Sequence, residues 1–164
     1  MTWYSFVKLL HVIAAIVFVG GVFARQLVRG SARKTSDVHM LASVMHAAGR
    51  IEQIMVIPGG NAAVILGVVL AIMQGFPAFG FLQGASKNWL LVSIVQLVTS
   101  FVLVPTVFLP RGRKFEPILD AARAEGRITP ELRAAMDDRV VQYAHYYEEL
   151  STIVIVALMV LKPF

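Results

Sequence analysis

The chain has 164 residues, of which 57% are hydrophobic, 15% are charged and none is cysteine, with a formal net charge of +5. A soluble domain averages about 25% charged residues, so this composition indicates one domain whose main solvent is lipid. The absence of cysteine excludes disulfides, thiolate metal sites and cysteine nucleophiles. The basic residues flank apolar runs, a pattern typical of membrane topology rather than of nucleic-acid binding.

Four segments have the length and composition of membrane-spanning helices, each of which needs about 20 mostly apolar residues. The first carries Lys8 within its apolar run and lacks a small-residue cleavage site, so we expect a retained span and not a signal peptide. The fourth must bring His145, Glu148 and Glu149 toward the membrane in order to cross it. We predict an all-α integral membrane four-helix bundle, a single domain over 1–164, with spans at 3–24, 52–74, 89–109 and 140–162.

Short helices are expected between the spans. A cap around Asp37 predicts a helix over 37–50, and Gly126 ends a helix over 115–125. A further helix opens at Pro130 and is expected to continue unbroken into the fourth span. Pro58 is expected to bend the second span.

The basic residues predict the orientation of the spans. Twelve of the 15 Lys and Arg residues lie in the first and third loops or beside them, and only Lys8, Lys87 and Lys162 lie on the other side. We therefore expect both termini on the outer face, the short helices in the cytoplasm, and a multi-pass protein of the bacterial inner membrane. Trp3 and Trp89 fit an outer aromatic belt.

A group of polar residues lies at membrane depth in the outer half. His11 and Gln96 are each about 10–12 Å below an outer tryptophan, at a rise of about 1.5 Å per residue, and Asn61 lies somewhat deeper. A buried imidazole is a candidate ligand for a metal or a haem iron, and Lys8, three residues earlier, is placed to pair with a haem propionate. The alternative is that His11 hydrogen-bonds Gln96 or Asn61 and joins two helices.

A second group of charges lies near the inner edge of the membrane. Glu149 is about 20 Å from Lys162 along the fourth span, and Arg25, Arg50 and Glu52 reach the same level from other spans. One interpretation is a proton or substrate path from the cytoplasm that uses Glu149. The other is a structural ion pair of Glu149 with Arg25 or Arg50.

Small residues occur on the first two spans, at Gly20-Gly21, Gly59-Gly60 and Gly67. They favour close helix packing over a space for a flat cofactor. His39 and His46 are seven residues apart, too far for one compact metal site, and we expect them on a solvated helix face.

Several segments carry a family resemblance. The run Phe6 to Ala15 with Gly20-Gly21, the Ile57-Pro58-Gly59 start, the loop 126–132 and the ending 159–163 resemble a family of small bacterial membrane proteins of unknown function, number 2269. More distantly, Lys8-x-Leu10-His11, Pro58 and Glu149-Leu150-Ser151 are similar to HemJ-type protoporphyrinogen oxidases and to CopD-type membrane domains.

The HemJ-type resemblance implies haem b, with His11 as a ligand and Glu149 at the place of a fourth-span glutamate. The chain departs from that pattern at Ser93, where the family has a lysine, and at Ser151, where it has a proline.

Three functions remain open at this stage. The first is a membrane b-haem protein for electron transfer or porphyrinogen-type oxidation, a haem-dependent oxidoreductase if it is an enzyme. In this function His11 binds the haem iron and Glu149 handles protons. The cofactor site is lined by Lys8, Gln96 and Asn61. The second is a non-catalytic accessory or assembly subunit of a larger membrane complex. The third is a homo-oligomeric conduit for metal ions or small solutes. The lipid bilayer is a partner in all three.

Overall fold

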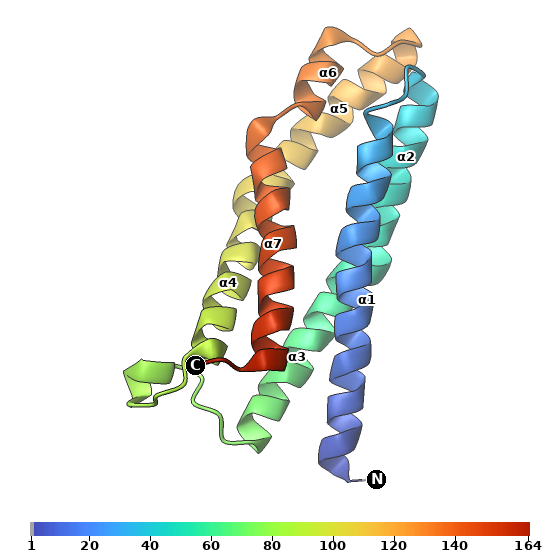
Figure 1. Cartoon of the computed structure of the whole chain (residues 1–164). Coiled ribbons are helices and arrows are strands. Elements are labelled where there is room, and N and C mark those ends of the chain that lie inside the picture. The colour runs from blue at the N-terminus through green and yellow to red at the C-terminus, as the bar shows by residue number, and fades with distance from the viewer. Residues whose placement is uncertain (1) are drawn as a thin grey trace.

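The structure, a computed structural model that describes residues 2–164, is a bundle of four helical rods (Figure 1). Each rod is long and apolar enough to cross a membrane, which confirms the prediction of an all-α four-span protein. The two termini lie at the same end of the bundle (Figure 1). We call this the outer end and the opposite one the inner end, after the predicted orientation. The rods are Trp3–Ala32, Val38–Met73, Trp89–Glu125 and Pro130–Leu161.

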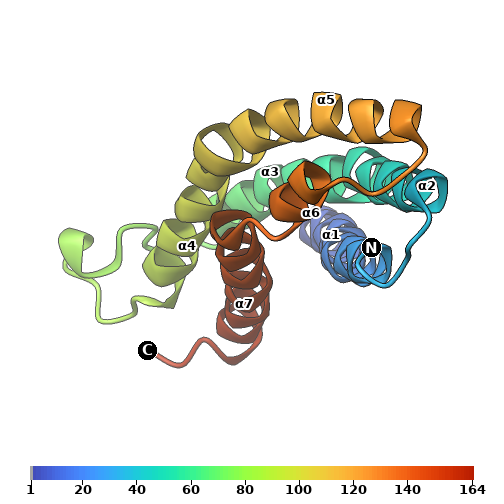
Figure 2. The same cartoon turned by 90° about the horizontal axis from the view of Figure 1, so that it is seen from above.

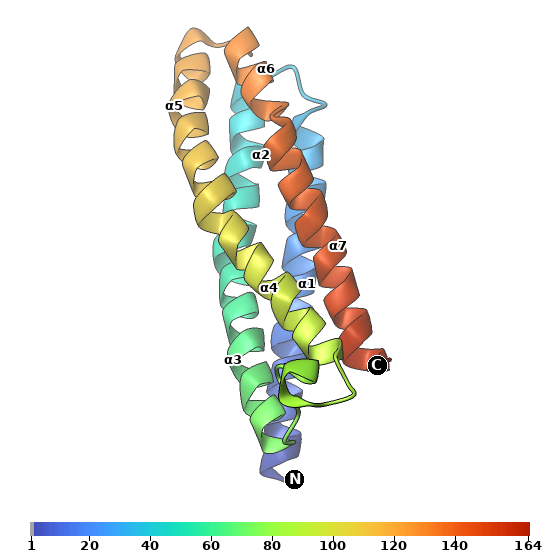
Figure 3. The same ribbon diagram turned by 90° about the vertical axis from the view of Figure 1, so that its left-hand side faces the viewer.

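The rods pair into two hairpins, which Figure 3 shows from the side. In the first hairpin α1 packs along the second rod, and in the second hairpin α4 packs along α7. Apart from a small apolar cluster at the outer end, neither α1 nor α3 packs closely against α4. The first hairpin consists of α1 (Trp3–Ala32), α2 (Val38–Ile51), the π-helical turn η1 (Glu52–Val56) and α3 (Ile57–Met73). The second consists of α4 (Trp89–Leu103), the π-helical turn η3 (Val104–Phe108), α5 (Leu109–Glu125), α6 (Pro130–Met136) and α7 (Arg139–Leu161).

Glycines allow α1 to approach the second rod closely. A Cβ atom added to Gly21 would lie 2.7 Å from Cβ of Met55, and one added to Gly59 would lie 2.9 Å from the main-chain nitrogen of Phe18. Real Cβ atoms do not come this close to their neighbours, so any larger residue would push the helices apart. The packing explanation is therefore confirmed for Gly21 and Gly59.

Both π-helical turns stand just before a proline. Pro58 follows η1 and Pro110 follows η3, each two residues beyond the end of the turn. A proline in a helix lacks the N–H, and its ring collides with the carbonyl four residues earlier, which lies inside the π turn in both cases. The wider turn makes room for the ring. At Pro58, where the sequence predicts a bend, the structure has a π turn, and a second π turn before Pro110 is not predicted from the sequence.

A small apolar core closes the inner end, where α2 and α5 run side by side (Figure 2). Its most deeply buried members are at most 1% exposed, and they come from the end of α1, from α2, from α5 and from α6. This cluster lies beyond the apolar spans and makes the inner end a packed cap rather than a set of loose loops. The buried residues are Ala32, Val38, Leu41, Ala122 and Leu132.

The helices of this cap begin and end largely where the sequence predicts. Asp37 caps α2, and its carboxylate accepts the main-chain N–H of His39 at 2.7 Å. Gly126, with φ of 70°, ends α5 in the left-handed conformation that glycine tolerates. Thr129 caps α6.

The prediction that the helix from Pro130 continues unbroken into the fourth span is wrong. Helix α6 ends at Met136, and α7 begins only at Arg139. The Asp138 carboxylate accepts the main-chain N–H groups of Val140 and Val141, at 2.8 and 3.2 Å, and so starts a new helix. This cap competes with helix continuation because it uses the same amide groups.

At the outer end a second apolar cluster joins the two hairpins. Trp89, Leu90 and Leu158 are buried there, and Ala71 of α3 packs against them. The main-chain oxygen of Phe164 accepts the N–H groups of Asn88 and Trp89, at 2.9 and 3.1 Å, which satisfies the start of α4. The apolar loop between the hairpins contains the short 3-10 turn η2 (Gly80–Gln83).

Candidate functional site

His11 lies on α1, where that helix faces α3. Its ring is half-buried, and Nδ1 lies 2.9 Å from the main-chain oxygen of Ala63. A carbonyl oxygen only accepts, so Nδ1 carries the proton and donates it. Nε2 then has a free lone pair, because a neutral imidazole holds one proton. The structure gives Nε2 no hydrogen-bond partner within residues 2–164.

Gly67 sets the position of this ring. A Cβ atom added at Gly67 would lie 3.0 Å from Cε1 of His11 and 3.5 Å from Nδ1. The glycine therefore lets the imidazole lie flat against α3 and reach the carbonyl one turn earlier. Lys8, three residues before His11, is exposed toward the outer end and shares its helix face.

The structure does not join His11 to the other predicted cofactor residues. Asn61 is exposed on α3 and lies about 200° around the helix from Ala63, so it faces away from His11. Gln96 belongs to α4, in the other hairpin, which does not pack closely on α1. The alternative is therefore wrong about the partners Gln96 and Asn61 and right about the role, because the hydrogen bond of His11 to the Ala63 carbonyl joins α1 to α3. The hydroxyls of Thr99 and Ser100 bond carbonyls of their own helix.

A second polar site, near the inner end, ties the two hairpins together. The Arg25 guanidinium, which is 3% exposed, donates from one terminal nitrogen to Glu52 of η1 and from the other to Glu148 of α7. The arginine thus forms ion pairs with both hairpins at once. The N–H on its Nε atom is enclosed and has no partner in the described chain.

His145 extends this network. Nη1 of Arg29 lies 2.7 Å from Nε2 of His145, and Nδ1 of His145 lies 3.3 Å from the Glu148 carboxylate. Arginine only donates, so Nε2 accepts and Nδ1 donates to Glu148. The Phe108 ring of η3 stacks on the imidazole at 4.5 Å between centroids. We call the set Arg25, Arg29, Glu52, His145 and Glu148 the ionic junction.

The ionic junction corrects one expectation about Glu149. Glu148, and not Glu149, pairs with Arg25, and Arg50 is exposed. Glu149 is half-buried beside the junction, and its Oε1 atom is enclosed with no partner in the described chain. Glu148 and Glu149 lie about 100° apart around α7, so only one of them can face Arg25, and in the structure it is Glu148.

Arg29, His145 and Phe108 are not predicted from the sequence to belong to one site. A signal for the first two was present, because Arg25 and Arg29 are four apart on α1 while His145 and Glu148 are three apart on α7. Each pair therefore presents two polar groups on one helix face. Nothing in the local sequence indicates that Phe108 covers them. His39 and His46 are exposed on α2, on a solvated face.

The two sites have different chemical capacities. Every charged group of the ionic junction except Arg25 Nε is matched by an opposite charge or a hydrogen bond, as expected of a junction that fixes helix packing. His11 keeps one ring nitrogen available. One imidazole is enough for a haem iron, because the porphyrin supplies four nitrogen ligands of its own.

Comparison with known proteins identifies a family. The family described as "Predicted integral membrane protein (DUF2269)" matches residues 5–163, nearly the whole chain. No curated protein and no solved structure matches the chain.

Proposed function

The chain belongs to the DUF2269 family of predicted integral membrane proteins, and from this premise we propose that it is a b-type haem protein. In this proposal it works in electron transfer or porphyrinogen-type oxidation in the bacterial inner membrane. His11 is the axial ligand. Haem supplies one-electron chemistry at its iron, and the chain supplies the ligand, the orientation and the dielectric.

One observation carries the proposal: the hydrogen bond from Nδ1 of His11 to the carbonyl of Ala63, at 2.9 Å. Metal-ligating histidines almost always donate their second ring N–H to a carbonyl or a carboxylate, which fixes the tautomer and makes the other nitrogen a better ligand. A histidine that served only to join α1 to α3 would need the same hydrogen bond. It would not need a free lone pair on its other nitrogen within the hydrocarbon, where unsatisfied polar groups are costly.

Two further residues support a charged, flat ligand at this level. Lys8 is exposed on the same face of α1 and nearer to the outer end, so its ammonium is placed to pair with a propionate at the membrane surface. Gly67 removes the Cβ that would push the imidazole away from α3. Gln96 and Asn61, which lie elsewhere, have no role in this version of the site.

Glu149 is the carboxylate that we assign to proton exchange with the cytoplasmic side. Glu148 is held by Arg25 and His145, whereas the enclosed Oε1 atom of Glu149 has no partner in the described chain. A carboxylate without a fixed counter-ion is free to gain and lose a proton, and one at membrane depth is a functional candidate.

The test is the absorption spectrum of protein extracted from native membranes in mild detergent. We expect a Soret band in the unaltered protein. In His11→Ala the haem-to-protein ratio should fall more than about 100-fold. Loss of a residue that only supports a metal ligand typically lowers metal affinity roughly 10–100-fold, so a larger fall identifies the ligand itself. His39→Ala and His46→Ala, which alter exposed histidines of α2, should keep the band.

A colourless, folded protein that co-purifies in fixed ratio with a larger complex would contradict the haem proposal and favour the accessory-subunit role. Equal loss of the band in all three histidine variants would contradict the assignment of His11. A flux of ions or solutes through liposomes that disappears in Glu149→Gln would favour the conduit.

A further inference from the structure

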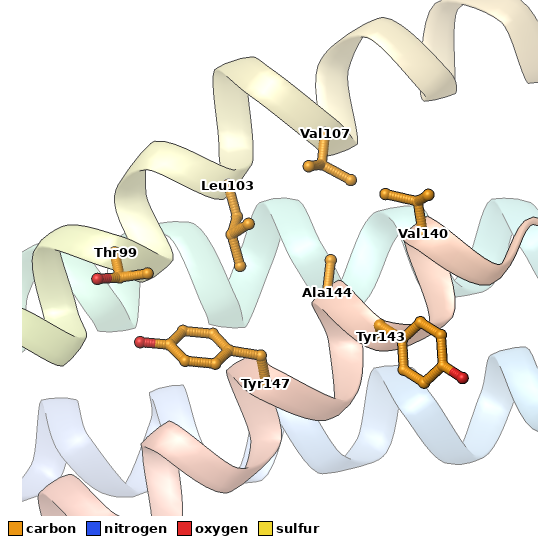
Figure 4. A pocket seen from close by; sticks show the side chains of 7 residues that line it. All are labelled: Thr99, Leu103, Val107, Val140, Tyr143, Ala144 and Tyr147. Atoms are coloured by element: carbon orange, nitrogen blue, oxygen red, sulfur yellow. The ribbon is translucent and has the colours of Figure 1, made fainter.

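A groove lies between the two rods of the second hairpin, well away from His11. Its volume is about 350 Å³, and Figure 4 shows the seven side chains that line it. Apart from a threonine and two tyrosines, these side chains are aliphatic. On one side Thr99, Leu103 and Val107 follow one another at four-residue spacing. On the other side α7 contributes Val140, Tyr143, Ala144 and Tyr147.

The depth of the groove places it in the inner half of the bilayer. Thr99 is ten residues from Trp89 and Val107 is eighteen, which corresponds to about 15 Å and about 27 Å below the outer belt. The hydrocarbon core is about 30 Å thick. The groove therefore runs from the middle of the bilayer to the inner headgroup region.

A guanidinium group stands where the groove reaches that region. Arg111 lies four residues after Val107 and so continues the spacing of Thr99, Leu103 and Val107 along the rod. Its Nε donates to the Asp138 carboxylate at 2.9 Å, which fixes the side chain beside the start of α7. The terminal nitrogens of Arg111 have no partner within residues 2–164. Arg139, next to Val140, is exposed at the same end of the groove.

We propose that this groove binds one acyl chain of an anionic phospholipid of the inner leaflet, with the lipid phosphate on Arg111. An apolar channel of bilayer depth that ends in guanidinium groups matches an amphiphile with an apolar tail and a negative head. Basic pockets between spans on the cytoplasmic side are general sites for such lipids, and arginine binds phosphate with paired N–H donors. This inference does not depend on haem binding.

The charge at the headgroup is tested by native mass spectrometry of the full chain, extracted from nanodiscs that contain equal phosphatidylglycerol and phosphatidylcholine. We expect one retained phosphatidylglycerol per chain. In Arg111→Gln its preference over phosphatidylcholine should fall about fivefold, the factor that corresponds to roughly 1 kcal/mol per basic residue at an anionic surface.

The matched control is Arg113→Gln, which removes the same charge from an exposed position about 200° around α5, and it should keep the preference. Equal retention of the two lipids by the unaltered chain would overturn the proposal. An equal fall in Arg111→Gln and Arg113→Gln would overturn it too, because net charge alone would then explain binding.

The apolar part of the site has its own test. Ala144→Leu adds atoms inside the groove, and Ala157→Leu adds the same atoms to an exposed position on the outer half of α7. Retained phosphatidylglycerol should fall several-fold in the first and stay unchanged in the second. If Ala144→Leu fails to fold, Val140→Phe covers the exposed inner end of the groove and should have the same effect. Full retention in a folded groove variant would overturn the proposal.

Discussion

His11 and the ionic junction are both polar sites in helices that are otherwise apolar, and they differ in how their hydrogen-bonding capacity is used. In the ionic junction a 3%-exposed arginine meets two carboxylates, and the histidine beside it uses both ring nitrogens. At His11 only one ring nitrogen is used. The difference separates a site whose groups hold the hairpins together from one that leaves a ring nitrogen without a partner in the described chain.

The two sites also differ in what surrounds them. The ionic junction draws on both hairpins and lies near both π-helical turns, since Glu52 belongs to η1 and Phe108 to η3. His11 makes its contact within the first hairpin alone. Changes at the ionic junction should therefore act on the assembly of the whole bundle, and changes at His11 on its chemistry.

The largest expected effect on stability is that of Arg25→Ala. It leaves two carboxylates without their shared counter-ion, and breaking a buried ion pair typically costs about 3–5 kcal/mol. The free energy of unfolding in mixed micelles measures this cost. Haem bound per folded chain should not change, which would sharpen the contrast between the sites.

Arg123→Ala is the control for Arg25→Ala, because Arg123 forms an exposed pair with Asp120 at 3.6 Å. Its effect should stay below about 1 kcal/mol. If the two variants were equally stable, the ionic junction would not hold the hairpins together. Replacing Arg25, Glu52 and Glu148 together by Met, Gln and Gln should cost less than Arg25→Ala alone, since no uncompensated charge then remains.

Gly67→Ala should have an intermediate effect on stability and a large one on the proposed chemistry. The new Cβ would lie 3.0 Å from Cε1 of His11, so the ring must shift by a few tenths of an ångström, which disturbs its hydrogen bond to Ala63. Overpacking of this kind costs about 1–3 kcal/mol. Loss of the partner of Nδ1 should weaken haem binding roughly 10–100-fold, measured by titration of the haem-free protein.

Gly49→Ala provides the comparison for Gly67→Ala, because nothing lies within 4 Å of the added atom on α2. It should leave haem binding unchanged and stabilise the helix by roughly 0.5–1 kcal/mol. An unaltered haem affinity in Gly67→Ala would mean that the hydrogen bond to Ala63 does not prepare His11 for a ligand.

The smallest effect is expected for Phe108→Leu. The stacked ring at 4.5 Å is lost while most of the apolar volume stays, so the cost should be about 0.5–1.5 kcal/mol in the free energy of unfolding. Phe101→Leu changes an exposed ring on the same rod and should cost less. Equal costs for the two variants would mean that the Phe108 ring does not stabilise the ionic junction.

The sequence predicts those parts of this fold that depend on local physics. Apolar length gives the four rods, and Asp37, Gly126 and Thr129 give helix ends, because each acts on amide groups a few residues away. It misses the break before Arg139, where two consecutive acidic residues contain a cap signal that competes with helix continuation. It predicts a bend at Pro58, where the structure has a π turn, and it does not predict the π turn before Pro110.

The contacts between rods are less accessible from the sequence. Depth along each helix correctly brings Arg25 and Glu52 to one level, but depth does not give rotation about the helix axis, so it does not distinguish Glu148 from Glu149. It also places Gln96 at the level of His11, although the hairpins do not pack closely there. The partner of His11 is a main-chain carbonyl, which every residue carries and no pattern of side chains indicates.

The most direct measurement of the central claim is chemical rescue of the His11 site. In His11→Gly the imidazole is removed and space is left in its place, so added imidazole should restore the Soret band that the variant lacks. In the reduced, unaltered protein we expect an iron–histidine stretch by resonance Raman spectroscopy. A Soret band that persists in His11→Gly without imidazole would contradict the account, since the iron would then be held elsewhere.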